Sequence, residues 1–174
     1  MTTLTAPDTW GEPRSRTVTW HDPAPAAAQG LALPGLDYLR AMVDGVLPPP
    51  PIAGLMQMAL VEAEPGRVVF TCVPDESAYN PIGAVHGGLV CTLLDSVAGC
   101  ALHSTLPQGR GYTSIEIKVS YLKPVRAVSG TLTAVGTVVK AGSRVAFTEG
   151  VVTDSSGAVV ATATSTLLVF DLPG

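Results

Sequence analysis

The fold is decided by Asn80-Pro81-Ile82-Gly83-Ala84-Val85-His86-Gly87-Gly88, a stretch that continues directly as Leu89-Val90-Cys91-Thr92-Leu93-Leu94-Asp95. Two adjacent glycines leave the backbone free of side chains at the point where an apolar segment of helical length begins. This segment carries one carboxylate, that of Asp95. Because a lone carboxylate is costly to bury unless something uses it, we interpret the stretch as a catalytic site built on one helix.

The helix is predicted to run from about Gly87 to Leu102. Its apolar positions cover nearly the whole circumference, which is typical of a helix enclosed by protein on almost every side. These positions are Leu89, Val90, Leu93, Leu94, Val97, Ala98, Ala101 and Leu102. A helix of this kind requires a sheet around it.

Strands are predicted on both sides of the helix. Residues 55–62 and 67–73 precede it as a hairpin with a tight turn at 63–66. Residues 114–121 alternate polar and apolar side chains with a period of two, and a bias toward Val and Thr continues through 130–140, 144–153 and 158–170. Turns are expected at 140–143 and 154–157. The order predicts an α+β fold: two strands, one long helix on a face of a curved sheet, then an antiparallel meander of four strands.

The N-terminal residues 1–35 are predicted to be an arm, and residues 36–174 to form one domain. The arm is rich in proline and contains Trp10 and Trp20. Two interpretations stay open: a partly disordered tail, or an arm that the two rings anchor on the body or on a neighbouring subunit. A short amphipathic helix is expected over 36–46, followed by a stiff extended spacer at Pro48 to Pro51 that leads into the first strand.

Composition limits the classes of function. In 174 residues, 47% are hydrophobic and only 14% charged, which leaves little polar surface for a monomer and favours a homo-oligomer. A net charge of −4 without a basic face argues against nucleic acid. The odd number of cysteines and the lack of a signal-peptide pattern favour reduced thiols and a cytoplasmic location. No apolar run reaches the ~20 residues of a membrane span, so no membrane partner is expected.

Several of these residues together form a family pattern: Asn80, the triplet His86-Gly87-Gly88, Asp95, Ser114 and the segment Tyr121-Leu122-Lys123-Pro124. They resemble the hotdog-fold acyl-CoA thioesterases of the PaaI (phenylacetic acid degradation) type, which are related to the 4-hydroxybenzoyl-CoA thioesterases. The resemblance covers roughly residues 50 to 170 and leaves the arm unexplained.

The resemblance implies a hotdog fold, in which a curved antiparallel sheet of about five to six strands wraps a long buried central helix. It also implies hydrolysis of an acyl-CoA to a carboxylic acid and coenzyme A, without cofactor or metal. Subunits of that family pair edge to edge into dimers with shared active sites, and dimers commonly form tetramers.

Gly87 and Asp95 are the principal catalytic candidates. The backbone N–H of Gly87 lies where free amides and the positive end of the helix dipole converge, so we expect it to stabilise an oxyanion. Alternatively, Gly87 and Gly88 serve only to allow a tight helix entry. Burial would make Asp95 a better base, and it is expected to act as general base or as nucleophile. The alternative is an Asp that faces a solvent channel or caps a loop.

The resemblance assigns further roles. Asn80 is expected to orient the water or the carbonyl, and is otherwise an ordinary turn residue before Pro81. Ser114 is expected to place the water, with Thr113 as the fallback, and is otherwise a polar residue on the wet face of a strand. His86 is expected to have a structural role, with its side chain hydrogen-bonded to the backbone of the loop that presents Gly87.

The sequence gives less specific signals for substrate-binding residues than for catalytic residues. Coenzyme A carries phosphates, and the available cations are Arg110, Lys123, Arg126, Lys140 and Arg144. We predict Lys140 and Arg144, which flank a strand turn, together with Gly88 and Thr113. Apolar walls are expected from Leu55, Met56, Met58 and Val90. The three histidines lack the spacing of metal ligands, so no metal is expected.

Helix geometry bears on how the site is assembled. Gly87 and Asp95 are eight residues apart, which at ~1.5 Å per residue is about 12 Å along one helix. This is too far for both to act on one carbonyl, so a two-fold partner is expected to complete each site. Two alternatives to a thioesterase remain: a hotdog dehydratase or hydratase, which needs a His paired with a carboxylate, and a non-catalytic acyl-CoA-binding protein.

Overall fold

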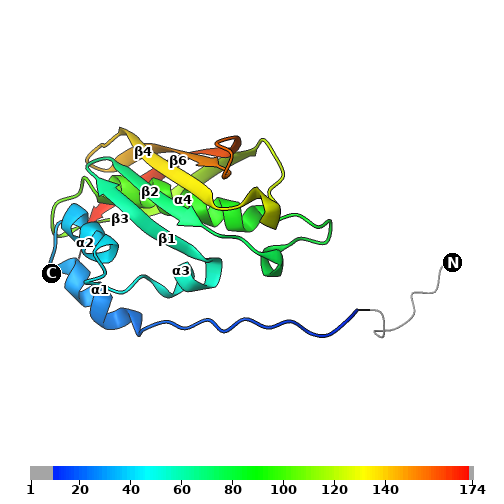
Figure 1. The fold of residues 1–174 in the computed structure, drawn as a ribbon. Helices are drawn as coiled ribbons and strands as arrows, with labels where there is room; N and C mark the ends of the chain where they lie inside the picture. The colour runs from blue at the N-terminus through cyan, green and yellow to red at the C-terminus, as the bar shows by residue number, and fades with distance from the viewer. Residues whose placement is uncertain (1–9, 173–174) are drawn as a thin grey trace.

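The computed structural model describes residues 10–172, in which helix α4 lies against one antiparallel sheet (Figure 1). The four α-helices are α1 (Pro23–Leu31), α2 (Gly35–Val43), α3 (Pro51–Met56) and α4 (Gly87–His103). The six strands are β1 (Met58–Glu64), β2 (Arg67–Cys72), β3 (Arg110–Tyr121), β4 (Leu132–Lys140), β5 (Val145–Thr153) and β6 (Val159–Asp171). Two 3₁₀ turns are η2 (Glu76–Ala78) and η3 (Ala127–Ser129). The predicted α+β class, the long helix and the six-stranded sheet are confirmed.

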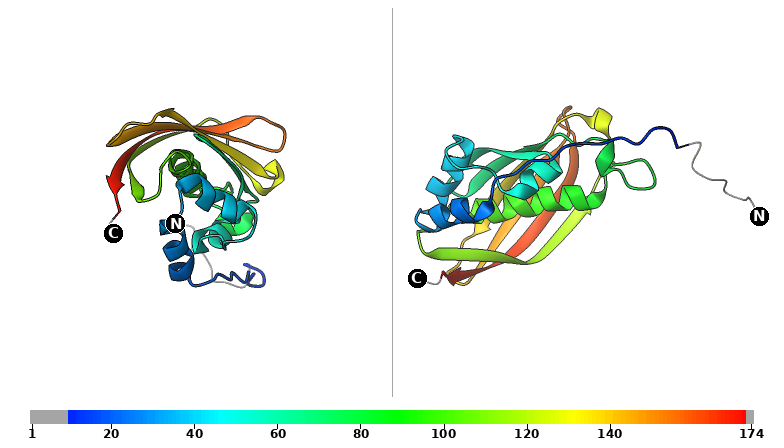
Figure 2. Two further views of the ribbon diagram at one scale, coloured as in Figure 1. Left: turned by 90° about the vertical axis from the view of Figure 1, so that its left-hand side faces the viewer. Right: turned by 90° about the horizontal axis from the view of Figure 1, so that it is seen from below.

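The sheet curves around α4, as the end-on view in Figure 2 shows, and this is the hotdog fold. Its strand order is β1-β2-β4-β5-β6-β3, with all pairs antiparallel. The predicted four-strand meander is therefore wrong. Only β4, β5 and β6 follow one another, while β3 crosses to the far edge and pairs with β6. Alternation along a sequence predicts that a segment is a strand, but sequential strands are neighbours in only about two thirds of cases.

Two glycines let α4 approach the middle of the sheet. Gly136 of β4 and Gly150 of β5 are directly paired across the ladder. A Cβ atom on Gly136 would lie 2.2 Å from the carbonyl oxygen of Val97, and one on Gly150 would lie 2.9 Å from Leu94. Any side chain at these positions would push the helix off the sheet.

The helix is less enclosed than the sequence predicts. Leu93, Leu94 and Val97 are fully buried against the sheet. A second stripe, spaced by three or four residues, stays partly accessible in this chain: Gly88, Cys91, Thr92, Asp95 and Ser96. Asp95 is thus half-buried rather than buried, on the partly accessible side of α4.

The region before β1 differs from the predicted spacer. Pro51 begins α3, where its missing N–H costs nothing and its fixed φ suits the first helical turn. The helix ends at Gln57 in the left-handed conformation, so Leu55 is helical and the first strand starts at Met58. The prediction of an extended spacer from Pro48 to Pro51 is therefore wrong at Pro51, which is helical.

The predicted arm contains a helix of its own. Asp22 caps α1 by accepting a hydrogen bond from the N–H of Ala24, and the chain before it is extended. The side chains of Trp10 and Trp20 are 82% and 64% exposed, so neither ring anchors the arm on the body of the same chain. Residues 1–9 of the arm lie outside the described residues.

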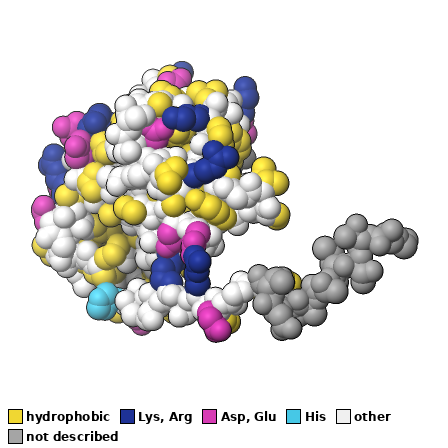
Figure 3. All heavy atoms as spheres, turned by 45° about the vertical axis from the view of Figure 1, so that its right-hand side comes forward, with side chains coloured by type: hydrophobic (Ala, Val, Ile, Leu, Met, Phe, Trp, Pro, Cys, Tyr) yellow, Lys and Arg dark blue, Asp and Glu magenta, His cyan; other side chains and the backbone are white. Residues whose placement is uncertain are grey.

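Ion pairs hold the extended segment instead. Arg14 pairs with Glu76, and Arg16 approaches Asp75 and donates a hydrogen bond to the carbonyl of Leu55. Basic and acidic side chains gather where this segment meets the body in Figure 3. Within residues 10–172, no helix is long and apolar enough to span a membrane.

Candidate active site

The entry of α4 is organised by His86. Its Nδ1 accepts a hydrogen bond from the N–H of Gly88 at 2.8 Å, and its carbonyl accepts one from the N–H of Leu89 at 3.0 Å. This side-chain cap is the geometry that the predicted structural role of His86 requires. Among the described residues, the N–H of Gly87 donates to no partner. Among the first three N–H groups of α4, only that of Gly87 therefore has no hydrogen-bond partner. It is also the N–H group that was predicted to stabilise an oxyanion.

Tyr121, at the end of β3, covers Gly87. Its hydroxyl donates to the carbonyl oxygen of Gly87 at 2.9 Å. A Cβ atom on Gly87 would lie 3.0 Å from Cζ of this ring, so the ring and the bare backbone are in close contact. Burial, followed by the nearby Cys91 thiol, raises the pKa of Tyr121. The sequence marked Tyr121 only as part of a family segment, since nothing local showed that its ring meets a glycine 34 residues away.

Asn80 shapes the loop that leads to the helix. Its Oδ1 accepts hydrogen bonds from the N–H groups of Ile82 and Ala84, both at 3.1 Å. Its own N–H donates to the carbonyl of Ala84, which closes the loop. The carboxamide oxygen is thus occupied by the turn, and the carboxamide NH₂ is the part of this side chain that can meet a ligand.

A cavity of about 330 Å³ brings these groups together, and we call it the Gly87 cavity. Asn80, Gly87, Tyr121 and Lys123 contribute its polar groups. Its apolar walls include Val90, which was predicted to line the pocket. One cavity is therefore lined by Gly87, by Asn80 and by the tyrosine whose hydroxyl binds the Gly87 carbonyl.

A second cavity, of about 490 Å³, lies on the other side of the helix entry, and we call it the His86 cavity. His86, Gly88 and Thr92 line it from the helix, and Arg16 lines it from the N-terminal segment. The predicted wall residues Leu55 and Met56 also line this cavity. Met58 was predicted to join them but is only 7% exposed, because β1 buries its side chain in the core.

Asp95 meets Ser114 further along the helix. The Ser114 hydroxyl donates to Oδ1 of Asp95 at 2.7 Å, across 19 residues of sequence. A β-bulge between Ser114 and Glu116 interrupts the β3–β6 ladder beside this contact. Thr113, the fallback for Ser114, is the adjacent residue on the strand and points to the opposite face. The structure thus brings together the two residues that the sequence paired by family pattern.

The surroundings of Asp95 continue along the same side of α4. Tyr112, two residues before Ser114, packs closely on Gly99, where a Cβ atom would lie 2.7 Å from its ring. Burial raises the pKa of Tyr112 well above its usual range, with Cys100 and Asp95 as further causes. His103 follows between Tyr112 and Tyr38, with ring centroids 5.5 and 5.6 Å away. Burial between these rings lowers the pKa of His103.

A family model also matches the part of the chain that contains this candidate site. The model of the thioesterase superfamily matches residues 82–161, which include the helix entry, α4 and the Asp95–Ser114 pair. Over these residues the chain is similar to the thioesterase superfamily. Human acyl-coenzyme A thioesterase 13 is 33% identical over 94 residues, which are 54% of this chain and 66% of the human protein. The match thus spans just under two thirds of that relative.

Solved structures of similar chains extend the match. A phenylacetic acid degradation-related protein of Ralstonia eutropha is 28% identical, with a TM-score of 0.69 over 75% of this chain and 98% of that chain. A Streptococcus mutans protein solved with acetyl-CoA is 29% identical, with a TM-score of 0.61 over 67% of this chain and 91% of that chain. The chain is therefore similar in fold to these two proteins over at least two thirds of its length.

The two cations that were predicted to bind the substrate lie apart from the helix entry. Lys140 ends β4 and Arg144 precedes β5, both exposed at the turn between those strands. Neither lines any of the five cavities found on the described residues. Gly88 lines the His86 cavity, whereas Thr113 lines none of the five. In a single chain, therefore, only Gly88 of the four predicted substrate-binding residues lies at the helix entry.

Metal ligation has no support in the described part of this hotdog chain. Between residues 10 and 172, no group of three or more His, Cys, Asp or Glu side chains is close enough to hold a metal ion. His86 is occupied by the Gly88 amide, and His103 lies between aromatic rings.

Proposed function

We propose that the chain hydrolyses the thioester bond of an acyl-CoA to a free carboxylic acid and coenzyme A. The observation that carries this proposal is the half-buried Asp95 carboxylate held by the Ser114 hydroxyl on the uncovered side of α4. Two relatives support the substrate class: one is named an acyl-coenzyme A thioesterase, and another was solved with acetyl-CoA.

The Gly87 amide is proposed to stabilise the oxyanion. When an oxygen nucleophile attacks the acyl carbon, the carbonyl oxygen becomes negatively charged, and an open N–H at a helix N-terminus can donate to it. Collapse of this intermediate breaks the carbon–sulfur bond and releases coenzyme A as a thiolate. The Asn80 carboxamide in the same cavity is proposed to orient the carbonyl or the water.

Asp95 is proposed to supply the nucleophile in one of two ways. As general base it takes a proton from water while the water oxygen attacks the acyl carbon. As nucleophile its own oxygen attacks, and water then hydrolyses the resulting anhydride. Ser114 donates to Oδ1 only, so in either case it orients the carboxylate and leaves Oδ2 for the reaction.

Each site is proposed to combine groups from two copies of the chain. Gly87 and Asp95 are about 12 Å apart along α4, so one chain cannot apply both to the same carbonyl. Among the described strands, β3 is an edge that pairs only with β6, and the stripe that carries Asp95 is uncovered nearby. Pairing of two β3 edges would bring a second α4 alongside, and a tetramer would pair such dimers.

A dehydratase or hydratase is less compatible with this site. That chemistry needs a His and a carboxylate acting together, but His86 uses its Nδ1 to cap the helix. Within residues 10–172, no carboxylate forms an ion pair with His86.

The test is release of free thiol from aromatic, short, medium and long acyl-CoAs, measured for wild type and Asp95→Asn. We expect wild type to hydrolyse at least one class, and the variant to lose on the order of 10²–10⁴-fold in kcat. Circular dichroism and the oligomeric state should be unchanged, because Asn retains the shape and an acceptor for Ser114. Equal turnover by the two proteins would refute the assignment of Asp95.

Isotope labelling separates the two mechanisms. In a single turnover in ¹⁸O-water, a general base leads to label in the released acid. A nucleophilic Asp95 whose anhydride opens at its own carbonyl leads to label in the enzyme, which mass spectrometry of the Asp95 peptide detects.

A further inference from the structure

Residues 14–19, which we call the strap, belong to the extended part of the arm and run past α3 (Figure 1). A Cβ atom on Gly54 of α3 would lie 3.4 Å from the carbonyl oxygen of Thr19 and 3.5 Å from the side chain of Val18. Among the described residues, no backbone hydrogen bond joins the strap to the body of the chain. The strap therefore depends on its side chains for attachment.

Arg16 makes the strap a wall of the His86 cavity. Of the described arm residues, Arg16 alone lines this cavity. Its guanidinium donates to the carbonyl oxygen of Leu55 at 2.9 Å and lies 3.6 Å from Oδ2 of Asp75. Because Leu55 lines the same cavity, release of the strap would remove this wall and open the cavity on that side.

The attachment of the strap is weak. The side chains of the ion pair between Arg14 and Glu76 are 78% and 54% exposed. Ion pairs this exposed contribute little to stability, and salt screens them. The following helix, α1, buries none of its residues, so it adds little to the attachment.

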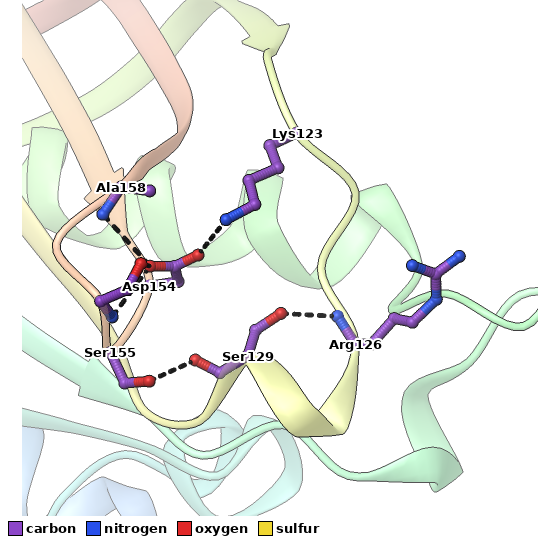
Figure 4. Close-up of polar contacts among 7 residues, drawn as sticks. Lys123, Arg126, Ser129, Asp154, Ser155 and Ala158 are labelled. Carbon is purple, nitrogen blue, oxygen red and sulfur yellow. Dashed lines mark hydrogen bonds and ion pairs between the residues drawn. The ribbon is translucent and has the colours of Figure 1, made fainter.

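An ion pair at the Gly87 cavity is built differently. Lys123 lines both the Gly87 cavity and a neighbouring cavity of about 360 Å³ at the β5–β6 turn. Its ammonium donates to Oδ2 of Asp154 at 2.7 Å, and Oδ1 accepts from the N–H groups of Ser156 and Ala158 (Figure 4). The side chain of Asp154 is only 5% exposed, and the hydrogen bond from Lys123, then those from Ser156, hold the pKa of this carboxyl well below its usual range. The Lys123 wall is therefore fixed, whereas the strap is a wall that can leave.

We propose that the strap closes the His86 cavity reversibly and thereby limits the size of the acyl group that the chain accepts. This rests on the proposed function. His86 and Gly88, which flank the proposed oxyanion donor Gly87, both line the cavity, and its walls are largely apolar. An acyl group whose carbonyl meets the Gly87 amide can therefore extend into it. Small groups fit while the strap is in place, and larger groups need its release.

The size limit follows from the populations of the closed and open strap. A substrate that binds only the open form has its apparent affinity reduced by the fraction of open molecules. Loss of one exposed ion pair should raise that fraction roughly two- to five-fold. A substrate that fits the closed cavity should not respond, so the strap predicts a change in KM that depends on the acyl group.

Limited cleavage by trypsin after Arg14 and Arg16 measures release of the strap without any substrate. Glu76→Gln removes the partner of Arg14 and keeps both cleavage sites. Because cleavage follows the open population, we expect this variant to be cut there roughly two- to five-fold faster than wild type at low salt. The difference should vanish in ~1 M sodium chloride.

Glu62→Gln is the matched control, because it removes the same charge from an exposed ion pair with Arg67 in the β1–β2 hairpin. Trypsin should cut this control at the wild-type rate. Equal rates for Glu76→Gln and wild type at low salt, or an equal rise for the control, would overturn the strap.

Hydrolysis of short and long straight-chain acyl-CoAs tests the size limit. For Glu76→Gln, KM for the long substrates should fall roughly two- to five-fold at unchanged kcat, while KM for the short ones stays at the wild-type value. Arg16→Ala should change KM in the same direction, and Arg16→Lys should stay closer to wild type. An equal change for short and long substrates would overturn the size limit. Absence of thiol release by wild type would instead overturn the proposed function, and the trypsin comparison would still decide whether the strap is released.

Discussion

The two ends of the candidate site on α4 differ in what each lacks. At the helix entry, the Gly87 cavity holds an open amide, the Asn80 carboxamide and a clamping tyrosine, but no carboxylate lines it. Two turns later, Asp95 and Ser114 form a hydrogen-bonded pair, yet neither lines any of the five cavities. The cavity at the helix entry thus has no carboxylate of its own chain, and the Asp95–Ser114 pair lies outside the five cavities described. This complementarity favours a site assembled from two copies.

The largest effect is expected from dimers that combine two different variants of the chain, one disabled at the helix entry and the other at Asp95. Gly87→Val should push Tyr121 away and disable the entry, and Asp95→Asn should disable the base. Each variant alone should be inactive. Dimers formed at random from equal amounts should regain about one quarter of wild-type activity, because half are mixed and each mixed dimer holds one intact site. Thiol release by the co-expressed mixture, without separation of the dimers, measures this.

The control is a mixture of either variant with a chain that carries both substitutions, which has no intact combination and should stay inactive. If the Gly87→Val and Asp95→Asn mixture also stays inactive although mixed dimers are present, each site lies within one chain and the comparison fails.

Tyr121→Phe should have a smaller effect that sharpens the role of the helix entry. The variant keeps the ring against Gly87 but loses the hydrogen bond to its carbonyl, a net contribution of about 1 kcal/mol. If that bond positions the oxyanion donor, kcat should fall roughly five-fold at constant KM. Steady-state kinetics on the preferred acyl-CoA measures kcat and KM separately.

Tyr38→Phe is the matched control, because Tyr38 packs on His103 at the far end of α4. It should leave both parameters unchanged. A rise in KM at constant kcat for Tyr121→Phe would show that its hydroxyl contributes ground-state binding rather than positioning.

Asp154→Asn should have the smallest effect, on stability rather than chemistry. The pKa of Asp154 is lowered in the folded chain, so its charged form stabilises the fold above the unfolded value near ~3.9, and this contribution is lost as pH falls below it. The variant should melt a few degrees lower at pH 7, with the difference shrinking between about pH 5 and pH 2. Thermal unfolding at a series of pH values measures it.

Ser77→Ala is a suitable comparison, since it loosens the exposed turn capped by Asp75 without touching Lys123. A pH-independent difference for Asp154→Asn would mean that the ion pair with Lys123 adds nothing to stability, and Lys123 would then not be anchored in the wall of the Gly87 cavity.

Much of the site was predictable because its signals are local. The glycine pair, the helix that follows and the carboxylate within it are adjacent in sequence, and helical periodicity is enough to place them. The Asp95–Ser114 contact was predicted from a family pattern, and the structure brings the two side chains to hydrogen-bonding distance. The shared site and the catalytic or binding roles of all the candidate residues stay predictions.

The predictions that were wrong concern features that depend on more than the local sequence. β3 pairs with β6 rather than with β4, because strand partners depend on which edges remain after the whole sheet forms. Pro51 starts a helix since its position relative to the first turn matters more than the run of prolines before it. The contact between Tyr121 and Gly87 was not predicted, because glycine has no side chain that a sequence pattern could pair with the ring.

The sequence by itself determined the long apolar helix, its glycine entry, its single carboxylate and the alternation of the strands, since these follow from short-range periodicity and backbone freedom. Only the tertiary structure decided which side of the helix stays uncovered, that Asp95 is half-buried there, and that Lys123 is anchored by Asp154 between two cavities. The physical reason is that burial and ion pairing depend on residues from distant segments, which meet only when the sheet curves around α4.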